Sequence, residues 1–213
     1  MKKKLHINEK VPLFCFDSLD STMNEIKKKK YNVYEKAVVL ANQQSNGRGR
    51  RNNNWISEKG NLYLSVRLRE KIKKNHHFAT YMVGIVLYDI INKYITKPLK
   101  IFIKWPNDIY VDNKKISGIL IEFLSYGKSI KDIIIGIGLN INNTPKELSK
   151  QTTCLKNYCN ESIDSMELIK LILQGIDSWV NILNYNKNNS KLKKLFFLLL
   201  KNIFIDPSSA IPL

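Results

Sequence analysis

A stretch rich in glycine and arginine, residues 46–55 (NGRGRRNNNW), combines residue types that bind anions. Gly47 and Gly49 allow backbone conformations that are closed to other residues, and a close approach to a ligand. Three guanidinium groups in the same stretch are planar and fit phosphate or carboxylate. They belong to Arg48, Arg50 and Arg51. The composition is typical either of a flexible arm on a nucleic-acid backbone or of a loop that wraps one small anion. Apolar segments flank it on both sides, which favours the loop.

Two residues that border this loop add to its chemistry. Gln44 precedes it, and its side-chain amide could donate a hydrogen bond to a carbonyl group. Trp55 ends it, and its indole could stack on a flat ring.

A second group of polar residues, KWPND at 104–108, follows an apolar strand-like segment. Pro106 forces a turn there. One interpretation is a surface turn with Asn-Asp turn chemistry and a core tryptophan. The other is a charged tip of a cleft, where Asp108 could hold Mg²⁺ and Lys104 could meet a phosphate.

A lysine enters an apolar strand-like segment in KKISGIL, residues 114–120. Strand alternation predicts Lys115 on the same face as Ser117 and Ile119, with Gly118 on the opposite face. A lysine near a glycine that admits close backbone approach could clamp a ligand. An edge-strand lysine that discourages aggregation is the alternative.

Two glycines, Gly136 and Gly138, interrupt the apolar segment GIGLNIN. Glycine weakens a strand, so something must pack closely against this backbone, or the strand carries a bulge.

The segment DSTMNE places Ser21 and Thr22 at an expected helix start. Either residue could cap the helix, or present its hydroxyl and backbone N–H groups to a ligand.

The elements that would position these residues form an α/β (α+β) domain with a mixed, hairpin-rich sheet and helices packed on it. Hydrophobic residues make up 44% of the 213-residue chain, enough to bury a core. Periodicity predicts strands at 11–19, 36–43, 61–69, 99–105, 114–124 and 131–141, with 61–69 half-buried. Helices are expected at 20–30, 77–94, 161–185 and 189–204, and hairpin turns at 111–115 and 125–129.

The chain is strongly basic, with 35 Lys+Arg against 18 Asp+Glu and a formal net charge of +17. We interpret the scattered lysines as compositional bias rather than as a nucleic-acid surface, and the run 27–30 as a solvated helix end. An odd cysteine count (Cys15, Cys154, Cys159) favours reduced thiols in a cytoplasmic protein. The N-terminus lacks the apolar run of a signal peptide, and LFFLLL at 195–200 is too short to span a membrane.

Five segments, taken together and in this order, resemble the biotin–protein ligase family. They are LDSTMNE, QQSNGRGRRNNNW, NLYLSV, KWPNDIYVDNKKISGILIE and IIIGIGLNIN. The resemblance runs from about residue 14 to residue 142. It implies a fold related to the catalytic domain of class II aminoacyl-tRNA synthetases. It also implies a two-step ligase reaction, in which biotin and ATP, with Mg²⁺, give biotinyl-5′-adenylate. The biotinyl group then passes to a lysine of a biotin carboxyl carrier domain, such as that of acetyl-CoA carboxylase.

The same resemblance implies roles for individual residues. Lys115 and Arg48 would be catalytic, and Asp108 would contact Mg²⁺. Biotin would contact Ser21, Thr22, Gln44, Gly47, Arg48, Gly49, Arg50, Lys115 and Gly118. The nucleotide would contact Arg50, Arg51, Trp55, Lys104, Asn107, Asp108 and Asn140. Gly136, Gly138 and Asn140 would form the floor beneath the ligand.

The sequence departs from the family pattern within two motifs, and we expect a departure at each end as well. Residues 52–54 are asparagines where the family continues Gly-Arg-x-Trp, and Met23 stands where many members carry asparagine. We expect no helix-turn-helix domain before the catalytic region, which favours the monofunctional type without a specific nucleic-acid partner. We expect a catalytic domain over 1–185 and a helical tail over 186–213, without the small β-barrel that usually ends the family.

Other functions remain open from the sequence. They are a lipoate or octanoate ligase or transferase of related fold, a non-catalytic homologue, and a nucleic-acid-binding module. A homodimer is expected, because strand-mediated dimers are common in the family.

Overall fold

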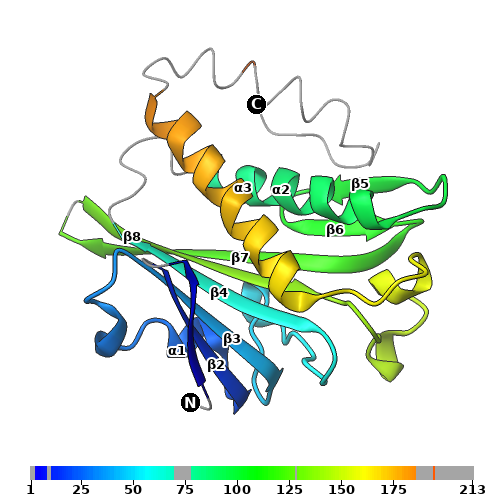
Figure 1. Cartoon of the computed structure of the whole chain (residues 1–213), viewed down its shortest axis with the longest axis horizontal. Coiled ribbons are helices and arrows are strands. Elements are labelled where there is room, and N and C mark those ends of the chain that lie inside the picture. Colours follow the sequence, from blue (N-terminus) through cyan, green and yellow to red (C-terminus); the bar gives the residue numbers. More distant parts are fainter. Residues whose placement is uncertain (1–2, 9–10, 70–77, 128, 186–193, 195–213) are drawn as a thin grey trace.

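An eight-stranded mixed sheet forms the centre of the computed structural model, which describes residues 3–8, 11–69, 78–127, 129–185 and 194. Its strand order is β1-β2-β3-β4-β8-β7-β6-β5 (Figure 1). The strands are β1 (Lys3–Asn8), β2 (Val11–Leu19), β3 (Lys36–Gln44), β4 (Leu62–Arg69), β5 (Ile101–Lys104), β6 (Asp108–Val111), β7 (Lys114–Tyr126) and β8 (Ser129–Leu139). Strands β2 and β3 pair in parallel, and the other neighbouring pairs are antiparallel. The predicted mixed sheet is confirmed.

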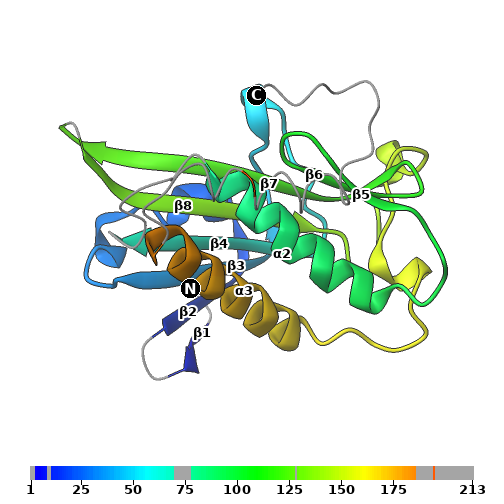
Figure 2. The ribbon, with the colours of Figure 1, turned by 90° about the horizontal axis from the view of Figure 1, so that it is seen from above.

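Two long helices, α2 (Ala79–Tyr94) and α3 (Ser165–Tyr185), lie side by side on one face of this sheet (Figure 2). A large core fills the space between them and the sheet. The short helix α1 (Thr22–Glu25) and the 3-10 turn η1 (Lys29–Tyr31) lie on the opposite face, over a smaller core. The sheet is therefore covered on both faces, and the second face has room for a site.

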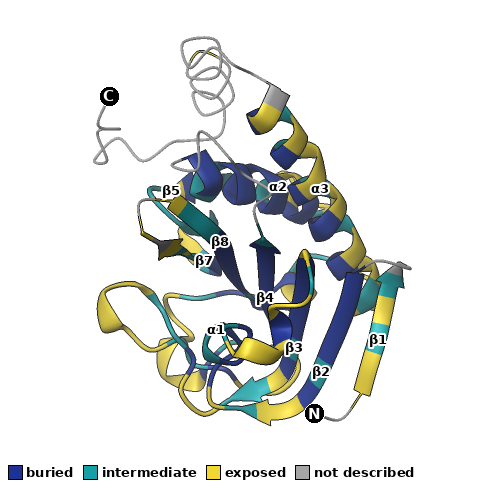
Figure 3. Cartoon of the chain, turned by 90° about the vertical axis from the view of Figure 1, so that its left-hand side faces the viewer, coloured by how far each residue is buried: buried dark blue, intermediate teal, exposed yellow. Residues whose placement is uncertain are grey.

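Strand β4 shows how the two faces divide. Leu64 and Val66 join the core beneath α2 and α3, whereas Ser65 and Arg67 point to the α1 face. The prediction that this strand is half-buried is wrong, because β3 and β8 flank it and both faces are covered (Figure 3). Its polar alternation therefore reflects a buried polar face rather than solvent.

Both predicted hairpins are confirmed. Asp112 and Asn113 join β6 to β7 with φ of 47° and 62°, the left-handed pair that a tight two-residue hairpin turn requires. Gly127 has φ 59° in the turn between β7 and β8. β7 therefore lies between β6 and β8, which brings three of the candidate segments together.

Two expectations about secondary structure are wrong, and one strand was not predicted. The helix expected at 20–30 ends at Glu25, because the chain turns inward to bury Ile26 and Tyr31 in the smaller core. Helix α3 starts at Ser165 rather than at 161, where the Asp164 side chain accepts a hydrogen bond from the Met166 N–H at 2.8 Å. Strand β1, an exposed edge strand of mostly charged and polar residues, was not predicted.

The helix expected at 189–204 lies outside the described residues. None of the helices that the structure describes is both long and apolar enough to cross a membrane.

Candidate functional site

A cavity of about 480 Å³ opens on the α1 face of the sheet. Its floor comes from β7 and β8, and its walls from α1, the loop after β3 and the turn between β5 and β6. The lining residues are Thr22, Met23, Gln44, Arg48, Gly49, Arg50, Arg51, Asn53, Asn54, Trp55, Trp105, Pro106, Asn107, Asp108, Lys115, Gly118, Ile119, Leu120, Gly136, Ile137 and Gly138. The candidate segments of the sequence thus meet in one place.

The Gly/Arg loop closes on itself above this cavity. The Trp55 N–H donates to the Gly47 carbonyl at 2.8 Å, and the Gly49 N–H donates to the Asn53 carbonyl at 2.7 Å. Arg51 and Asn52 turn the chain with φ of 53° and 62°. Asparagine tolerates this left-handed conformation better than most residues, so Asn52 fits this turn without a glycine. The predicted loop between two core strands is confirmed.

The Trp55 indole explains two of the strand glycines. A methyl group at Gly138 would lie 2.4 Å from Trp55 Cε2, and one at Gly118 would lie 2.6 Å from Trp55 Cζ3. A methyl group at Gly136 would lie 2.6 Å from Met23 Sδ. The ladder of β8 runs without a register shift through these glycines, so the bulge interpretation is wrong. Close packing against this backbone is confirmed, and the groups that pack there are the indole of Trp55 and the thioether of Met23.

Lys115 reaches the cavity because β7 carries a bulge. Ile109 pairs with Ser117 but Tyr110 pairs with Lys115, which leaves Ile116 as an extra residue. Lys115 therefore lies on the same face as Gly118, and the face assignment from simple alternation is wrong. Its ammonium group contacts Asp108 Oδ2 at 2.7 Å and lies 5.0 Å from the Trp55 ring.

The KWPND turn lines the cavity with all of its residues except Lys104. Asn107 donates to the Ile119 carbonyl and to Asp108 Oδ1, both at 3.0 Å, and accepts from Arg50 at 3.1 Å. Trp105, in a cis peptide with Pro106, also lines the cavity, and its indole N–H donates to the Tyr81 hydroxyl at 3.1 Å. The turn is therefore not a plain surface turn.

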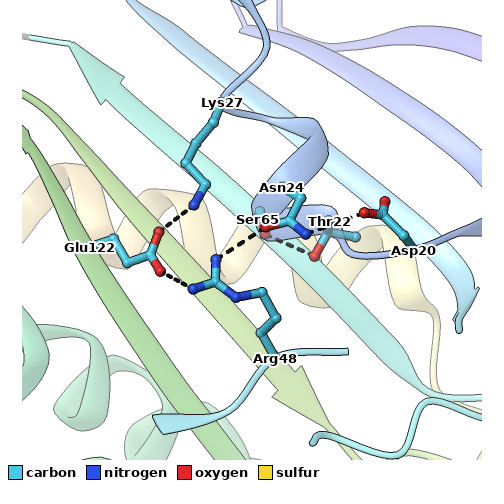
Figure 4. A network of polar contacts seen from close by, with 7 residues as sticks. All are labelled: Asp20, Thr22, Asn24, Lys27, Arg48, Ser65 and Glu122. Carbon is cyan, nitrogen blue, oxygen red and sulfur yellow. Dashed lines mark hydrogen bonds and ion pairs between the residues drawn. The ribbon is translucent and has the colours of Figure 1, made fainter. Parts of the chain in front are cut away.

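Arg48 is held against the cavity wall by side chains from two other elements (Figure 4). One terminal nitrogen donates to Glu122 Oε1 on β7 at 2.6 Å, and the other donates to Asn24 Oδ1 on α1 at 3.1 Å. The second oxygen of Glu122 accepts from Lys27 at 2.7 Å. Burial raises the pKa of Glu122, but Lys27 and Arg48 outweigh burial and the pKa is lowered. Lys27 is thus part of the site's surroundings rather than of a solvated helix end.

The start of α1 is tied to β3 and β4. The Thr22 N–H donates to Gln44 Oε1 at 2.7 Å, and the Thr22 hydroxyl accepts from Ser65 at 2.8 Å. The Ser21 side chain makes no cap hydrogen bond, so the capping interpretation is wrong for it. Its hydroxyl is fully buried and has no hydrogen-bond partner among the described residues.

Most of the predicted site residues line the cavity, and four do not. Gly47 supports the loop through its carbonyl, and Lys104 is exposed with its ammonium over the Tyr110 ring. Asn140 is buried and donates to the Thr153 carbonyl at 3.0 Å, so it is not part of the floor. Ser21 is the fourth.

Lining residues without a predicted role include Asn53, Asn54, Trp105, Leu120 and Ile137. The asparagines and Trp105 lie inside quoted motifs, whereas Leu120 and Ile137 carry no sequence signal beyond strand apolarity. No group of three or more acidic, histidine or cysteine side chains in the described ranges could hold a metal ion. Asp108 is the one carboxylate in the lining.

Comparison with known proteins identifies the family of this chain. The profile of the biotin/lipoate A/B protein ligase family matches residues 13–140. The bifunctional ligase/repressor BirA of Bacillus subtilis is 34% identical over 148 residues, which cover 67% of this chain and 45% of that protein. The biotin–[acetyl-CoA-carboxylase] ligase of Paracoccus denitrificans is 26% identical over 166 residues, 75% of this chain and 69% of that protein.

A solved structure of the Aquifex aeolicus biotin protein ligase in complex with biotin and ATP superimposes with a TM-score of 0.71 and 28% identity. The superposition covers 86% of this chain and 76% of that one. The chain spans less than half the length of the Bacillus relative. The matched segment nevertheless contains the Gly/Arg loop, the KWPND turn and both glycine-bearing strands. This chain belongs to the biotin/lipoate A/B protein ligase family.

Proposed function

We propose that this protein is an ATP-dependent biotin–protein ligase, which joins biotin to AMP and then transfers the biotinyl group to a lysine of a carrier domain. The observation that carries the proposal is the charge of the cavity. Four cationic side chains line it against one carboxylate, Asp108. They are Arg48, Arg50, Arg51 and Lys115.

The first step needs such cations, because two anions must meet. An oxygen of the biotin carboxylate attacks the α-phosphorus of ATP, the bond between the α- and β-phosphates breaks, and pyrophosphate leaves. Lys115 and Arg48 would offset the negative charge of the attacking carboxylate and of the α-phosphate. Fixed cations in a site with little water can each contribute several kcal/mol to the transition state.

The second step needs a cavity from which water is excluded, since the acyl-adenylate hydrolyses readily. The neutral amine of the carrier lysine attacks the acyl carbon, a C–N bond forms, AMP leaves, and the amine loses a proton. The Gly/Arg loop lies over the cavity and would shield the adenylate. Trp55, which already packs on Gly118 and Gly138, would support the adenine ring.

The fit of biotin itself rests on the polar groups near α1. Thr22 and Gln44 line the cavity, and the buried Ser21 hydroxyl lacks a partner in the described part of the chain. A buried polar group without a partner is costly, and because Ser21 does not line the cavity, a water rather than the ligand is expected to satisfy its hydroxyl. We propose that the ureido ring of biotin lies toward this end of the cavity.

The donor set fits a magnesium ion that arrives with ATP. Mg²⁺ at nucleotide sites is held by one or two carboxylates together with phosphate oxygens, and Asp108 supplies one carboxylate. When bound, Mg²⁺ would offset phosphate charge. Lys115 and Arg48 would offset the charge of the carboxylate and the α-phosphate in the same way when the ion is bound.

The carrier and the compartment also belong to the proposal. A net charge of +17 would attract an acidic carrier domain, and a biotin carboxyl carrier domain such as that of acetyl-CoA carboxylase is the proposed partner. The three cysteines are free thiols, which supports a reducing compartment such as the cytoplasm.

One experiment tests the proposal. The full chain is incubated with ATP, Mg²⁺ and labelled biotin, with and without a carrier domain, and the products are separated. We expect biotinyl-adenylate without carrier and labelled carrier with it. Folded protein that forms no adenylate would contradict the proposal. Adenylate formed from lipoate or octanoate in preference to biotin would change the proposed substrate to that acyl group.

A further inference from the structure

Glu122 joins three segments that are far apart in the sequence. It lies on β7, its Oε1 accepts from Arg48 of the Gly/Arg loop at 2.6 Å, and its Oε2 accepts from Lys27 after α1 at 2.7 Å. Figure 4 shows both contacts converging on the one carboxylate. Glu122 does not line the cavity, so its effect on a ligand passes through its partners.

The geometry fixes where the Arg48 guanidinium can point. Glu122 engages one terminal nitrogen of Arg48 and Asn24 engages the other. A guanidinium has five N–H groups, so these two hydrogen bonds leave three donors for an anion in the cavity. Arg48 is therefore held in place and still has N–H groups free to donate to a ligand.

The carboxylate of Glu122 is also partly shielded from water. Its side chain is 24% exposed and those of Arg48 and Lys27 are 34% and 27% exposed, so water screens the three groups only in part. Two cations share this carboxylate, which leaves the cluster with one net positive charge next to the cavity.

We propose that Glu122 is a positioning residue, which holds Arg48 over the cavity and keeps the Gly/Arg loop closed before any ligand binds. The inference rests on the proposed function for its catalytic consequence, but the closure of the loop does not depend on it. Lys27 holds the other oxygen of Glu122 and fixes the carboxylate toward the loop.

Limited trypsin digestion of the ligand-free protein tests loop closure directly, since Arg48, Arg50 and Arg51 are cleavage sites inside the loop. Glu122→Gln keeps the shape of the side chain and removes its charge. We expect cleavage in the loop, assigned by mass spectrometry, to become roughly fivefold faster, because a charge-assisted hydrogen bond is about twice as strong as a neutral one.

A matched control is Asp177→Asn. Asp177 is ion-paired with Lys36 at 2.7 Å, and it lies on α3, on the opposite face of the sheet. This variant also loses an ion-paired carboxylate, although one that is more exposed (56%) than Glu122, and its loop cleavage should equal that of the unaltered protein. Equal cleavage rates in Glu122→Gln and Asp177→Asn would overturn the inference.

A double-mutant cycle separates positioning from general stability. Glu122→Gln alone should shorten the retention of biotinyl-adenylate by roughly fivefold, as measured by filter binding. In an Arg48→Ala background, Glu122→Gln should shorten retention no further, because its effect passes through Arg48. A full additional loss in that background would overturn the inference.

The two proposals fail in different ways. An unaltered protein that forms no adenylate contradicts the ligase function and leaves the trypsin result standing. An unaltered protein that forms adenylate, with Glu122→Gln unchanged in both retention and cleavage, contradicts the role of Glu122 alone.

Discussion

Replacing Gly138 by alanine should displace the Trp55 indole and weaken both folding and nucleotide binding. The new methyl group would lie 2.4, 2.6 and 2.7 Å from Cε2, Nε1 and Cζ2 of Trp55. Ordinary contact begins near 3.4 Å, so the indole must move by about 1 Å. The Trp55 backbone cannot move freely with the indole, because both of its polar groups are hydrogen-bonded. The Trp55 N–H donates to the Gly47 carbonyl, and the Trp55 carbonyl accepts from the Ser57 hydroxyl at 2.8 Å.

The size of the effect follows from the cost of overpacking. Inserting one methyl group into a well-packed site costs about 1–3 kcal/mol. For a chain of this size that lowers the melting temperature by roughly 5 °C. If the displaced indole no longer supports adenine, the KM for ATP should rise by roughly tenfold, since about 1.4 kcal/mol is a factor of ten.

Urea unfolding and the rate of ATP-dependent adenylate formation measure the two effects. Trp55→Phe is the matching variant, because a phenyl ring is smaller than the indole that the methyl group would meet. In that background Gly138→Ala should cost much less stability. The reasoning is refuted if Gly138→Ala unfolds at the same urea concentration as the unaltered protein, or if its cost is undiminished beside phenylalanine.

Three further predictions follow from other contacts. Lys115→Ala should slow pyrophosphate release by roughly a hundredfold, whereas the exposed neighbour variant Lys114→Ala should not; equal rates would contradict the assignment. Burial raises the pKa of Glu25, but ion pairs with Lys28 and Lys30 and the hydrogen bond from Tyr31 lower it to about 2. The stability that Glu25 contributes, about 3 kcal/mol, is present above its unfolded pKa near 4.5 and is lost as the pH falls through about 2. Glu25→Gln should therefore be less stable in urea at pH 7, with the difference vanishing toward pH 2, and a constant difference would contradict this. Asn52→Val should lower the free energy of unfolding by about 1–2 kcal/mol, because residue 52 has φ 62° and valine fits the left-handed region poorly. It should also speed hydrogen exchange of the Gly49 amide, whereas Asn52→Gly should do neither.

Much of the fold could be predicted from local pattern. The strands β2, β3, β7 and β8 follow the expected apolar segments within a few residues, and the Asp112-Asn113 turn follows from the residues that tolerate left-handed backbone. Strand β1 was missed because an edge strand with one exposed side needs no apolar alternation. Helix α1 was overestimated because lysines have good helix propensity, while the burial of Tyr31 is decided by tertiary packing.

The site was predictable to the level of segments but not of contacts. Arginines and glycines in the loop, the KWPND turn and Lys115 were identified by their types and spacing, and the structure gathers them around one cavity. The inward direction of Lys115 depends on the bulge at Ile116, which no alternation pattern contains. Asn140 looked like a floor residue, yet its amide satisfies the Thr153 carbonyl instead.

The sequence by itself determined the family, the cationic character of the candidate segments and most of the strands and helices, although not β1, because these depend on residue type and short spacing. Tertiary structure alone decided which groups are partners across long separations. Glu122 and Lys27 are 95 residues apart, and Glu122 and Arg48 are 74 apart, yet one carboxylate holds both cations. Trp55 covers two glycines from strands it does not adjoin in sequence. Such pairs form only when the sheet is assembled, since they depend on which strands become neighbours and which faces they turn toward each other.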